Sequence, residues 1–152
     1  MGRVPLLAAL AASTSRVEFG PLVACALWWK PALLAKVAHT IDEISGGRFV
    51  LGLGAGWHGP EFTAYGIPFD HRVSRFEEAF TIIQTLLRQG EIDFAGRYYA
   101  ARACVLVPRG PRPEGPPLMV GSLGERMLRI TLPYVQMWNA WYADYGNDWR
   151  QL

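Results

Sequence analysis

Two glycine-containing segments are the places where this sequence could hold a ligand. The first is Gly52-Leu-Gly-Ala-Gly-Trp, and the second is Gly121-Ser-Leu-Gly-Glu-Arg. Each follows an apolar run that predicts a strand, and α/β proteins place ligands at strand ends, where a missing side chain lets a ring or a phosphate approach the backbone. In the second segment, Ser122 and the amides of the following helix could bind a phosphate group. Alternatively, Ser122 simply caps that helix.

The first segment invites comparison with the dinucleotide-binding fingerprint. That fingerprint leads from a strand directly into a helix, whereas Trp57-His-Gly-Pro intervenes here, so a nicotinamide-binding fold is disfavoured. A tight turn with a purely structural role is a further alternative.

Trp57 and His58 follow the first segment and are the candidate lining of a substrate pocket. An indole can wall a flat ring, and an imidazole titrates near neutrality. The alternative for His58 is an exposed loop residue, because no acidic partner stands at a fixed spacing. Other tryptophans at or just beyond predicted strand ends are Trp28, Trp29, Trp138 and Trp141. The sequence assigns no catalytic acid, base or nucleophile.

Composition excludes several classes of function. The 152 residues are 51% hydrophobic and 18% charged, as in a globular protein, and the net charge of +2 does not suggest a nucleic-acid partner. Cys25 and Cys104 stand far apart without metal-ligand spacing, so neither a metal site nor a disulfide framework is expected, and a cytoplasmic location fits best. No apolar run approaches the roughly 20 residues of a membrane span.

Alternating helix and strand patterns must position the two glycine segments. Helices are predicted after Pro5, from Pro31 to Ser45, after a capping box formed by Ser74 and Glu77, and over 124–132. Strands are predicted over 16–26, 49–54, 118–121 and 135–141, with a long loop over 55–71. Residues 91–107 predict a hairpin, and a proline-rich linker follows over 108–117.

This order predicts an α/β fold whose parallel sheet is covered on both sides. A doubly wound sheet and a (β/α)₈ barrel both satisfy the pattern.

The motifs also resemble, in order, those of the luciferase-like flavin oxidoreductases. The similar segments are Lys30-Pro-Ala-Leu-Leu-Ala-Lys, Gly46-Gly-Arg-Phe-Val-Leu-Gly-Leu-Gly-Ala-Gly-Trp, Tyr65-Gly-Ile-Pro-Phe, Phe94-Ala-Gly-Arg-Tyr-Tyr and Leu118-Met-Val-Gly-Ser-Leu-Gly-Glu-Arg. The resemblance implies a (β/α)₈ TIM barrel that binds FMN or the deazaflavin F420 and carries out hydride transfer or monooxygenation on a small organic substrate. The glycine-rich segment and the pair Trp138-Asn139 look more like the F420-using branch.

The resemblance also assigns residues to the cofactor site. The non-prolyl cis peptide that the family often has beneath the flavin ring falls at Leu22-Val23, so Leu22, Val23 and Ala24 would lie behind the ring. Gly54, Ala55 and Gly56 match the turn near the cofactor, and Ala55 stands where some members have arginine. The phosphate-binding turn of the family corresponds to Gly121, Ser122 and Gly124.

Measured against the family, residues 1–152 look like one incomplete barrel domain holding roughly strands 3 to 6, with residues 91–117 as an excursion. We therefore expect the chain alone to be inactive and to bind cofactor weakly or not at all, although homo-oligomers are possible. The alternatives are a truncated, non-catalytic remnant and a different α/β nucleotide-binding protein.

Overall fold

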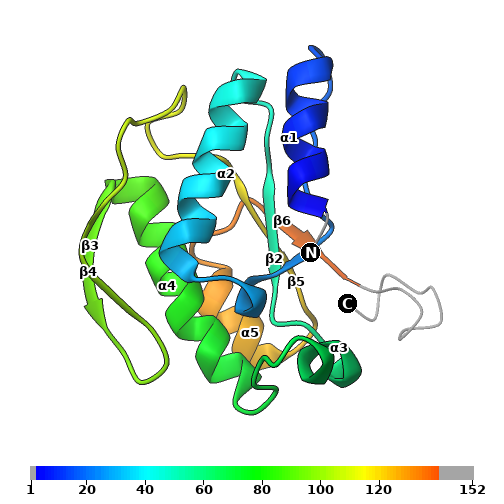
Figure 1. Cartoon of the computed structure of the whole chain (residues 1–152), viewed down its shortest axis with the longest axis vertical. Helices are drawn as coiled ribbons and strands as arrows, with labels where there is room; N and C mark the ends of the chain where they lie inside the picture. Colours follow the sequence, from blue (N-terminus) through cyan, green and yellow to red (C-terminus); the bar gives the residue numbers. More distant parts are fainter. Residues whose placement is uncertain (1–2, 141–152) are drawn as a thin grey trace.

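In the computed structural model, which describes residues 3–140, four parallel strands form one sheet (Figure 1). They are β1 (Ala24–Cys25), β2 (Leu51–Gly54), β5 (Leu118–Gly121) and β6 (Met137–Asn139), hydrogen-bonded in that order. The order in the sheet follows the order in the chain. A doubly wound sheet reverses its strand order at the ligand site, and the described strands contain no such reversal. The predicted α/β class with a parallel sheet is confirmed.

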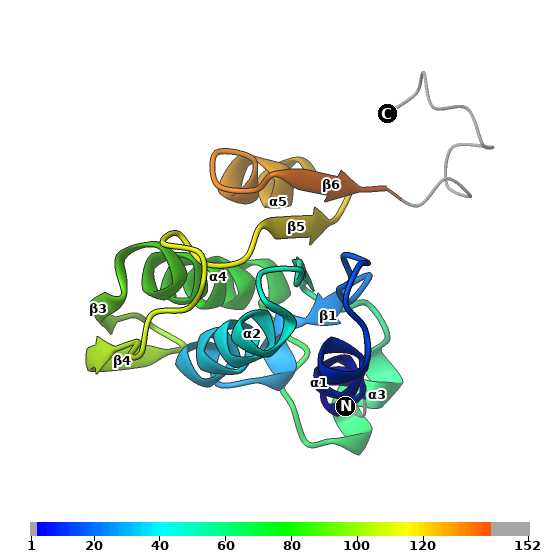
Figure 2. The same ribbon diagram turned by 90° about the horizontal axis from the view of Figure 1, so that it is seen from above.

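The long helices pack against one another in a series beside this sheet (Figure 2). Helix α1 (Arg3–Ser13) contacts α2 (Pro31–Ser45), α2 contacts α4 (Arg72–Gln89), and α4 contacts α5 (Glu125–Thr131). Within residues 3–140 the helices therefore form a single layer. The prediction that helices cover both faces of the sheet is wrong for this part of the chain. None of these helices is both long and apolar enough to cross a bilayer.

Strand residues alternate between the helix layer and the opposite face of the sheet. Leu51, Leu53, Leu118 and Val120 are buried in the core with residues of α2 and α4. The residues between them on β2 and β5 are Gly52, Gly54, Met119 and Gly121. The face turned away from the helices is therefore lined mainly by glycine.

Helices α2 and α4 form where the apolar spacing predicts them. In α4, Phe76, Phe80, Ile83 and Leu87 recur at helical spacing and are all buried. Pro31 begins α2, and both helices end at a glycine in the left-handed conformation, Gly46 with φ 66° and Gly90 with φ 85°.

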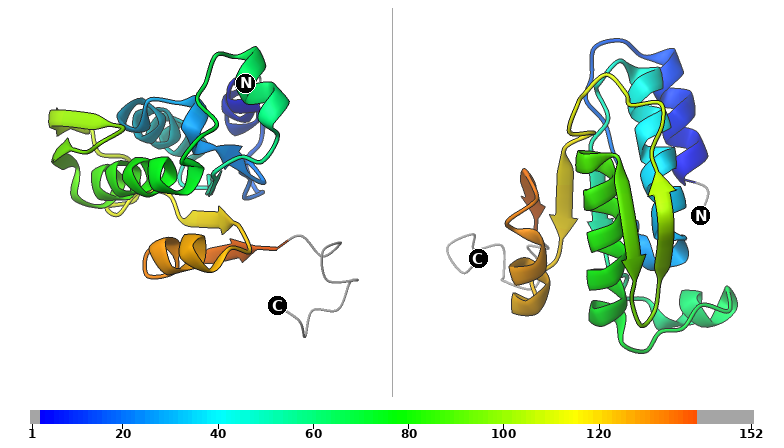
Figure 3. Two further views of the ribbon diagram at one scale, coloured as in Figure 1. Left: turned by 90° about the horizontal axis from the view of Figure 1, so that it is seen from below. Right: turned by 90° about the vertical axis from the view of Figure 1, so that its left-hand side faces the viewer.

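The excursion is an antiparallel hairpin and a linker, both bound to the helix layer (Figure 3). The hairpin comprises β3 (Glu91–Ala95) and β4 (Ala100–Val105). The carboxylate of Glu78 on α4 accepts hydrogen bonds from the amides of Arg97, Tyr98 and Tyr99 at 2.8–2.9 Å. These bonds fix the tip of the hairpin against the first half of α4.

Asp42 attaches the linker to α2 and to the start of β2. Its side chain is 1% exposed, accepts a hydrogen bond from Arg112 Nε at 3.0 Å, and lies 3.4 Å from the amide of Phe49. We expect Asp42→Asn to lower the free energy of unfolding by about 1–2 kcal/mol, because a charge-assisted bond is lost while the shape is kept. Urea denaturation measures this. The matched control is the exposed Asp93 on β3, where Asp93→Asn should change nothing; equal effects at both sites would contradict the prediction.

The predicted strand over 16–26 is mostly irregular. Only Ala24 and Cys25 join the sheet, and Phe19 makes an isolated bridge to Phe49. A short 3₁₀ helix, η1 (Ala26–Trp28), follows directly. The strand predicted over 135–141 is short and half-exposed, and Trp141 lies outside the described residues.

Two further expectations are corrected in the segment between β2 and α4. The predicted loop contains a helix, α3 (Gly59–Ala64), with Pro60 in its first turn. Helix α4 begins at Arg72 after His71, whose φ is 50°, and it has no side-chain cap. Ser74 is therefore inside the helix, and the predicted capping box is wrong.

Candidate functional site

Two of the three predicted cofactor segments, Gly54–Gly56 and Gly121–Gly124, lie at the carboxyl-terminal edge of the sheet, and the third reaches them through the Val23 side chain. Cys25 pairs with Gly54 at the end of β1 and β2, and Gly121 pairs with Asn139 at the end of β5 and β6. Since β2 also pairs with β5, Gly54–Gly56 and Gly121–Gly124 are neighbours. Leu22 and Val23 precede β1, and the Val23 side chain lies against Gly54 and Gly121. Positions far apart in the sequence thus form one continuous edge, which we call the strand-end edge.

Leu22 and Val23 are joined by a cis peptide bond, as the resemblance implied. The side chain of Val23 lies over the glycine face of the sheet. A Cβ atom built at Gly54 or at Gly121 would come within 2.9 Å of Val23 Cγ2, and one built at Gly52 would collide with the carbonyl oxygen of Pro21. These glycines leave room for the chain's own segment 21–23, which rests on the sheet.

The turn after β2 is held from two sides. Gly56 has φ 72°, and a Cβ there would come within 2.8 Å of Cys25 Sγ and of the Phe62 ring. Arg72, the first residue of α4, donates a hydrogen bond to the carbonyl oxygen of Gly56 and stacks over the ring of Phe69 at 4.4 Å. The contact of Arg72 was not predicted, because it joins residues that the sequence places in separate elements.

Trp57 and His58 lie beyond this turn on the surface. Trp57 is 81% exposed and its ring centroid lies 5.0 Å from that of His58. Among residues 3–140, His58 makes no ion pair, so the structure gives no reason to select it as an acid or a base. Neither residue lines the cavity beside η1 or the apolar hollow between α1 and α2.

Ser122 organises the other end of the edge. Its hydroxyl accepts a hydrogen bond from the Gly124 amide at 3.3 Å, and its carbonyl oxygen accepts one from Trp138 Nε1 at 2.7 Å. The residue that caps α5 is Gly124, without a side-chain hydrogen bond, so the alternative that Ser122 caps this helix is wrong. Through this bond the indole of Trp138, one of the tryptophans noted near predicted strand ends, connects β6 to the turn after β5, a contact that was not predicted.

The Cys25 thiol lies under this edge, between β1 and the turn at Gly56. Burial raises the pKa of the Cys25 thiol above its ordinary value, although bonds to the backbone of Leu27 and Trp28 act in the opposite direction. The thiol is therefore protonated at neutral pH, when thiols react slowly as nucleophiles.

A stability measurement above neutral pH tests this state of Cys25. Above about pH 8.5 the unfolded chain loses the thiol proton before the folded chain does, so the free energy of unfolding falls as the pH rises. Urea denaturation at several values from pH 7 to pH 10 should show a steeper decline for the native sequence than for Cys25→Ala. Parallel curves for the two proteins would contradict the prediction.

Comparison with known proteins defines the class to which this fold and edge belong. The family model described as luciferase-like monooxygenase matches residues 3–151. The chain belongs to the luciferase-like monooxygenase family. The pyrimidine monooxygenase RutA of Cronobacter turicensis is 39% identical over 113 residues, which are 71% of this chain and 30% of that protein. The protein of the same name from Agrobacterium fabrum is 38% identical over 109 residues, or 68% of this chain and 30% of its own length.

Solved structures agree with the assignment of the fold. The monooxygenase RslO1 of Streptomyces bottropensis is 28% identical with a TM-score of 0.73, covering 78% of this chain and 36% of that one. The coenzyme F420 dependent tetrahydromethanopterin reductase of Methanopyrus kandleri is 22% identical with a TM-score of 0.76, covering 90% and 43%. The chain thus spans about a third of the length of the curated relatives it matches.

Proposed function

We propose that this chain supplies the cofactor-binding surface of a flavin-dependent monooxygenase. The intact protein would be a (β/α)₈ barrel that acts on small organic molecules. Four strands in sequential order, with one layer of helices beside them, are what strands 3 to 6 of such a barrel would present. The observation that carries the proposal is that Gly54–Gly56 and Gly121–Gly124 are neighbours at one edge and that Val23, from the segment Leu22–Ala24, lies against Gly54 and Gly121. The free thiols of Cys25 and Cys104 support the predicted cytoplasmic setting.

The comparisons favour FMN over F420. The relatives at 38–39% identity are named as monooxygenases, whereas the F420-dependent reductase is 22% identical. A bound flavin supplies the ability to react with dioxygen, and a deazaflavin, which has carbon in place of the reactive ring nitrogen, acts mainly as a hydride carrier. A planar heterocycle of the pyrimidine kind is the substrate class that the names of the relatives suggest.

The residues of the strand-end edge fit an isoalloxazine ring and a phosphate. Leu22, which precedes β1, is 63% exposed and offers an apolar surface. Segment 21–23 is held by contacts with the glycine face, so the backbone that would support the ring is fixed before binding, which reduces the entropy cost of binding. Among residues 3–140, a Cβ at Gly124 would have only Ser122 Oγ within 4 Å, at 3.9 Å, so within this part of the chain a phosphate group can approach the turn.

The roles that follow for the chain's own residues are binding and orientation. Leu22, Val23 and Ala24 would support one face of the ring. The Ser122 hydroxyl, whose oxygen accepts from the Gly124 amide, would donate its proton to the phosphate. Ala55 has no charge to offer, so the phosphate would depend on the turn at Ser122. Trp57 and His58 would lie on the substrate side. The groups that move protons during the reaction are not assigned to this segment.

A chimera tests this function. Residues 3–140 would replace the matching segment of the Cronobacter turicensis relative, and the purified chimera would be examined for bound FMN by its absorbance and for oxygenation of a pyrimidine. We expect FMN in nearly every molecule, and Ser122→Asp should expel it because two negative charges repel. Ser13→Asp, on the exposed end of α1, is the matched control. A folded chimera without FMN would contradict the proposal and favour a non-catalytic remnant.

The chain by itself should bind FMN only weakly. Strands β1 and β6 each pair on one side within the described sheet, so the edge presents one half of a barrel wall. Isothermal titration of the 152-residue chain with FMN and with F420 should show dissociation constants well above those of the chimera. Tight binding of one cofactor per isolated chain would contradict this expectation while leaving the proposed function intact.

A further inference from the structure

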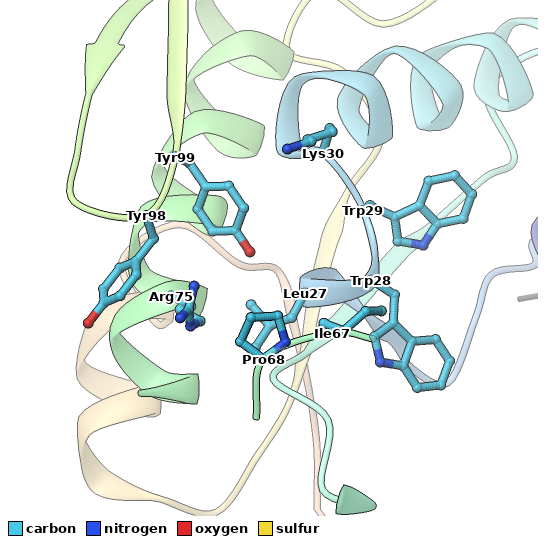
Figure 4. A pocket seen from close by; sticks show the side chains of 9 residues that line it. All are labelled: Leu27, Trp28, Trp29, Lys30, Ile67, Pro68, Arg75, Tyr98 and Tyr99. Carbon is cyan, nitrogen blue, oxygen red and sulfur yellow. The ribbon is translucent and has the colours of Figure 1, made fainter. Parts of the chain in front are cut away.

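A cavity of about 310 Å³ lies among the segments that follow β1 and β2, at the same end of the sheet as the strand-end edge (Figure 4). One side is formed by η1 and the start of α2, and the other by α4 and the tip of the β3–β4 hairpin. Its volume is at the lower end of the range of small-molecule pockets, about 300–1,000 Å³. Of the tryptophans noted near predicted strand ends, Trp28 and Trp29 line it, whereas the segments Leu22–Ala24, Gly54–His58 and Gly121–Gly124 do not.

The lining combines aromatic rings with positive charge. Trp28 and Trp29 stand on one side, and Tyr98 and Tyr99 on the other. The charged residues that line it are Lys30 and Arg75, and no carboxylate is among the lining residues in the described chain. Asp70 partly neutralises Arg75 at 3.0 Å, whereas Lys30 makes no ion pair within residues 3–140. The cavity therefore favours a flat ligand that carries negative charge.

The walls are fixed by contacts outside the cavity. The amides of Tyr98 and Tyr99 are bound to Glu78, and the Tyr98 ring stacks on Arg75 at 4.4 Å. Trp28 meets the ring of Tyr65 edge to face at 5.6 Å. A site whose side chains are already ordered loses little entropy when it binds a ligand.

Tyr99 adds a hydrogen-bond donor. Its hydroxyl and the Lys30 side chain face the same space (Figure 4). Burial raises the pKa of Tyr99, so the hydroxyl is protonated at neutral pH and can donate to an anion. A carboxylate in this space has an ammonium group and a hydroxyl within reach while its ring lies among the aromatic side chains.

We propose that this cavity, whose lining contains none of the strand-end residues proposed to bind the cofactor, is a second binding site for a small aromatic carboxylate. The aromatic part of the ligand would lie against Leu27, Pro68 and the Tyr99 ring, and its carboxylate would face Lys30 and the Tyr99 hydroxyl (Figure 4).

The test uses 1-naphthoate and its uncharged analogue 1-naphthamide, titrated into the 152-residue chain and followed by tryptophan fluorescence and isothermal titration. We expect one naphthoate per chain, bound about fivefold more tightly than the amide, which is the value of one exposed ion pair. Lys30→Met should abolish this preference. Lys36→Met, six residues along α2 and outside this cavity, should leave it unchanged.

Three outcomes would overturn the proposal: no saturable binding of naphthoate, equal binding of the acid and the amide, or an unchanged preference in Lys30→Met. Since Lys30 is exposed, that variant should fold, and its thermal unfolding verifies this. Tyr99→Phe provides a second variant, which should weaken naphthoate more than naphthamide. Competition by FMN for the same naphthoate site would also overturn the proposal, because it would move the ligand to the strand-end edge.

Discussion

Replacing Arg48 with methionine should lower the free energy of unfolding by about 3 kcal/mol, a large fraction of the stability of a domain of this size. The guanidinium donates to the carbonyl oxygens of Ala11, Thr14, Val17 and Ser45 at 2.7–3.0 Å. Two of these, Ala11 and Ser45, lie in the last turns of α1 and α2, where a positive charge is also favourable to the helix dipole. Methionine would leave several carbonyl groups without a donor.

Urea denaturation followed by circular dichroism measures the loss at Arg48. Arg48→Lys should recover less than half of it, because one ammonium group cannot reach all the oxygens that the planar guanidinium does. Arg126→Met is the control, since Arg126 pairs with Glu77 on the surface, both side chains being about half exposed. That change should cost at most about 1 kcal/mol. An equal loss of stability at Arg126 would show that the hydrogen bonds of Arg48 contribute no more than one surface ion pair does.

The long helices were predictable because their signals are local. Pro31, the apolar stripe of α4 and the glycines at positions 46 and 90 act within a few residues of the boundaries they set. The start of α4 was not predictable from Ser74, because it depends on the fold. Arg75 binds the carbonyl oxygen of Asp70 at 3.0 Å and Arg72 reaches back to Gly56, so contacts outside the helix determine where it begins.

Helix α3 was missed although the sequence carries a signal for it. Pro60 and Glu61 stand in its first turn, where proline and acidic residues are favoured, and Phe62 is fully buried. Glycines and prolines on either side of this segment are typical of loops, and they led to the prediction of a loop over 55–71. The dinucleotide-binding fold was disfavoured because Trp57-His-Gly-Pro separates the glycine segment from a helix. Since α3 begins at Gly59, this separation is too short to exclude that fold. The unreversed strand order now argues against that fold instead.

The location of the candidate site was predictable, but the packing within it was not. Glycines after two apolar runs mark two strand ends, and the resemblance added the cis peptide at Leu22-Val23, which the structure contains. Nothing in the sequence indicates that Val23 would lie on Gly54 and Gly121, because that contact depends on how segment 21–23 crosses the sheet. The glycines therefore make room for Val23, which belongs to the segment that we propose to support the flavin.

Alanine at Gly52 should destabilise the fold by about 3 kcal/mol, at the upper end of what a small overpacked group costs. Its Cβ would collide with the carbonyl oxygen of Pro21, which is backbone and cannot rotate away. Alanine at Gly54 should cost about 1–2 kcal/mol, because its Cβ meets the Val23 side chain at 2.9 Å. The control is Gly59→Ala, whose Cβ would meet the Phe69 ring at an ordinary 3.5 Å and should be tolerated.

Val23→Ala separates the two kinds of collision. Combined with Gly54→Ala, it removes the atom that is in the way, so the double variant should be more stable than the sum of the single losses by about 1 kcal/mol. Combined with Gly52→Ala it should rescue little, since the Pro21 carbonyl remains.

In the chimera, Gly52→Ala should also reduce bound FMN, because moving Pro21 shifts the Leu22-Val23 peptide that would support the ring. Full FMN content in a folded Gly52→Ala chimera would mean that segment 21–23 is not the support for the ring. Equal rescue by Val23→Ala at both glycines would contradict the predicted difference between the two collisions.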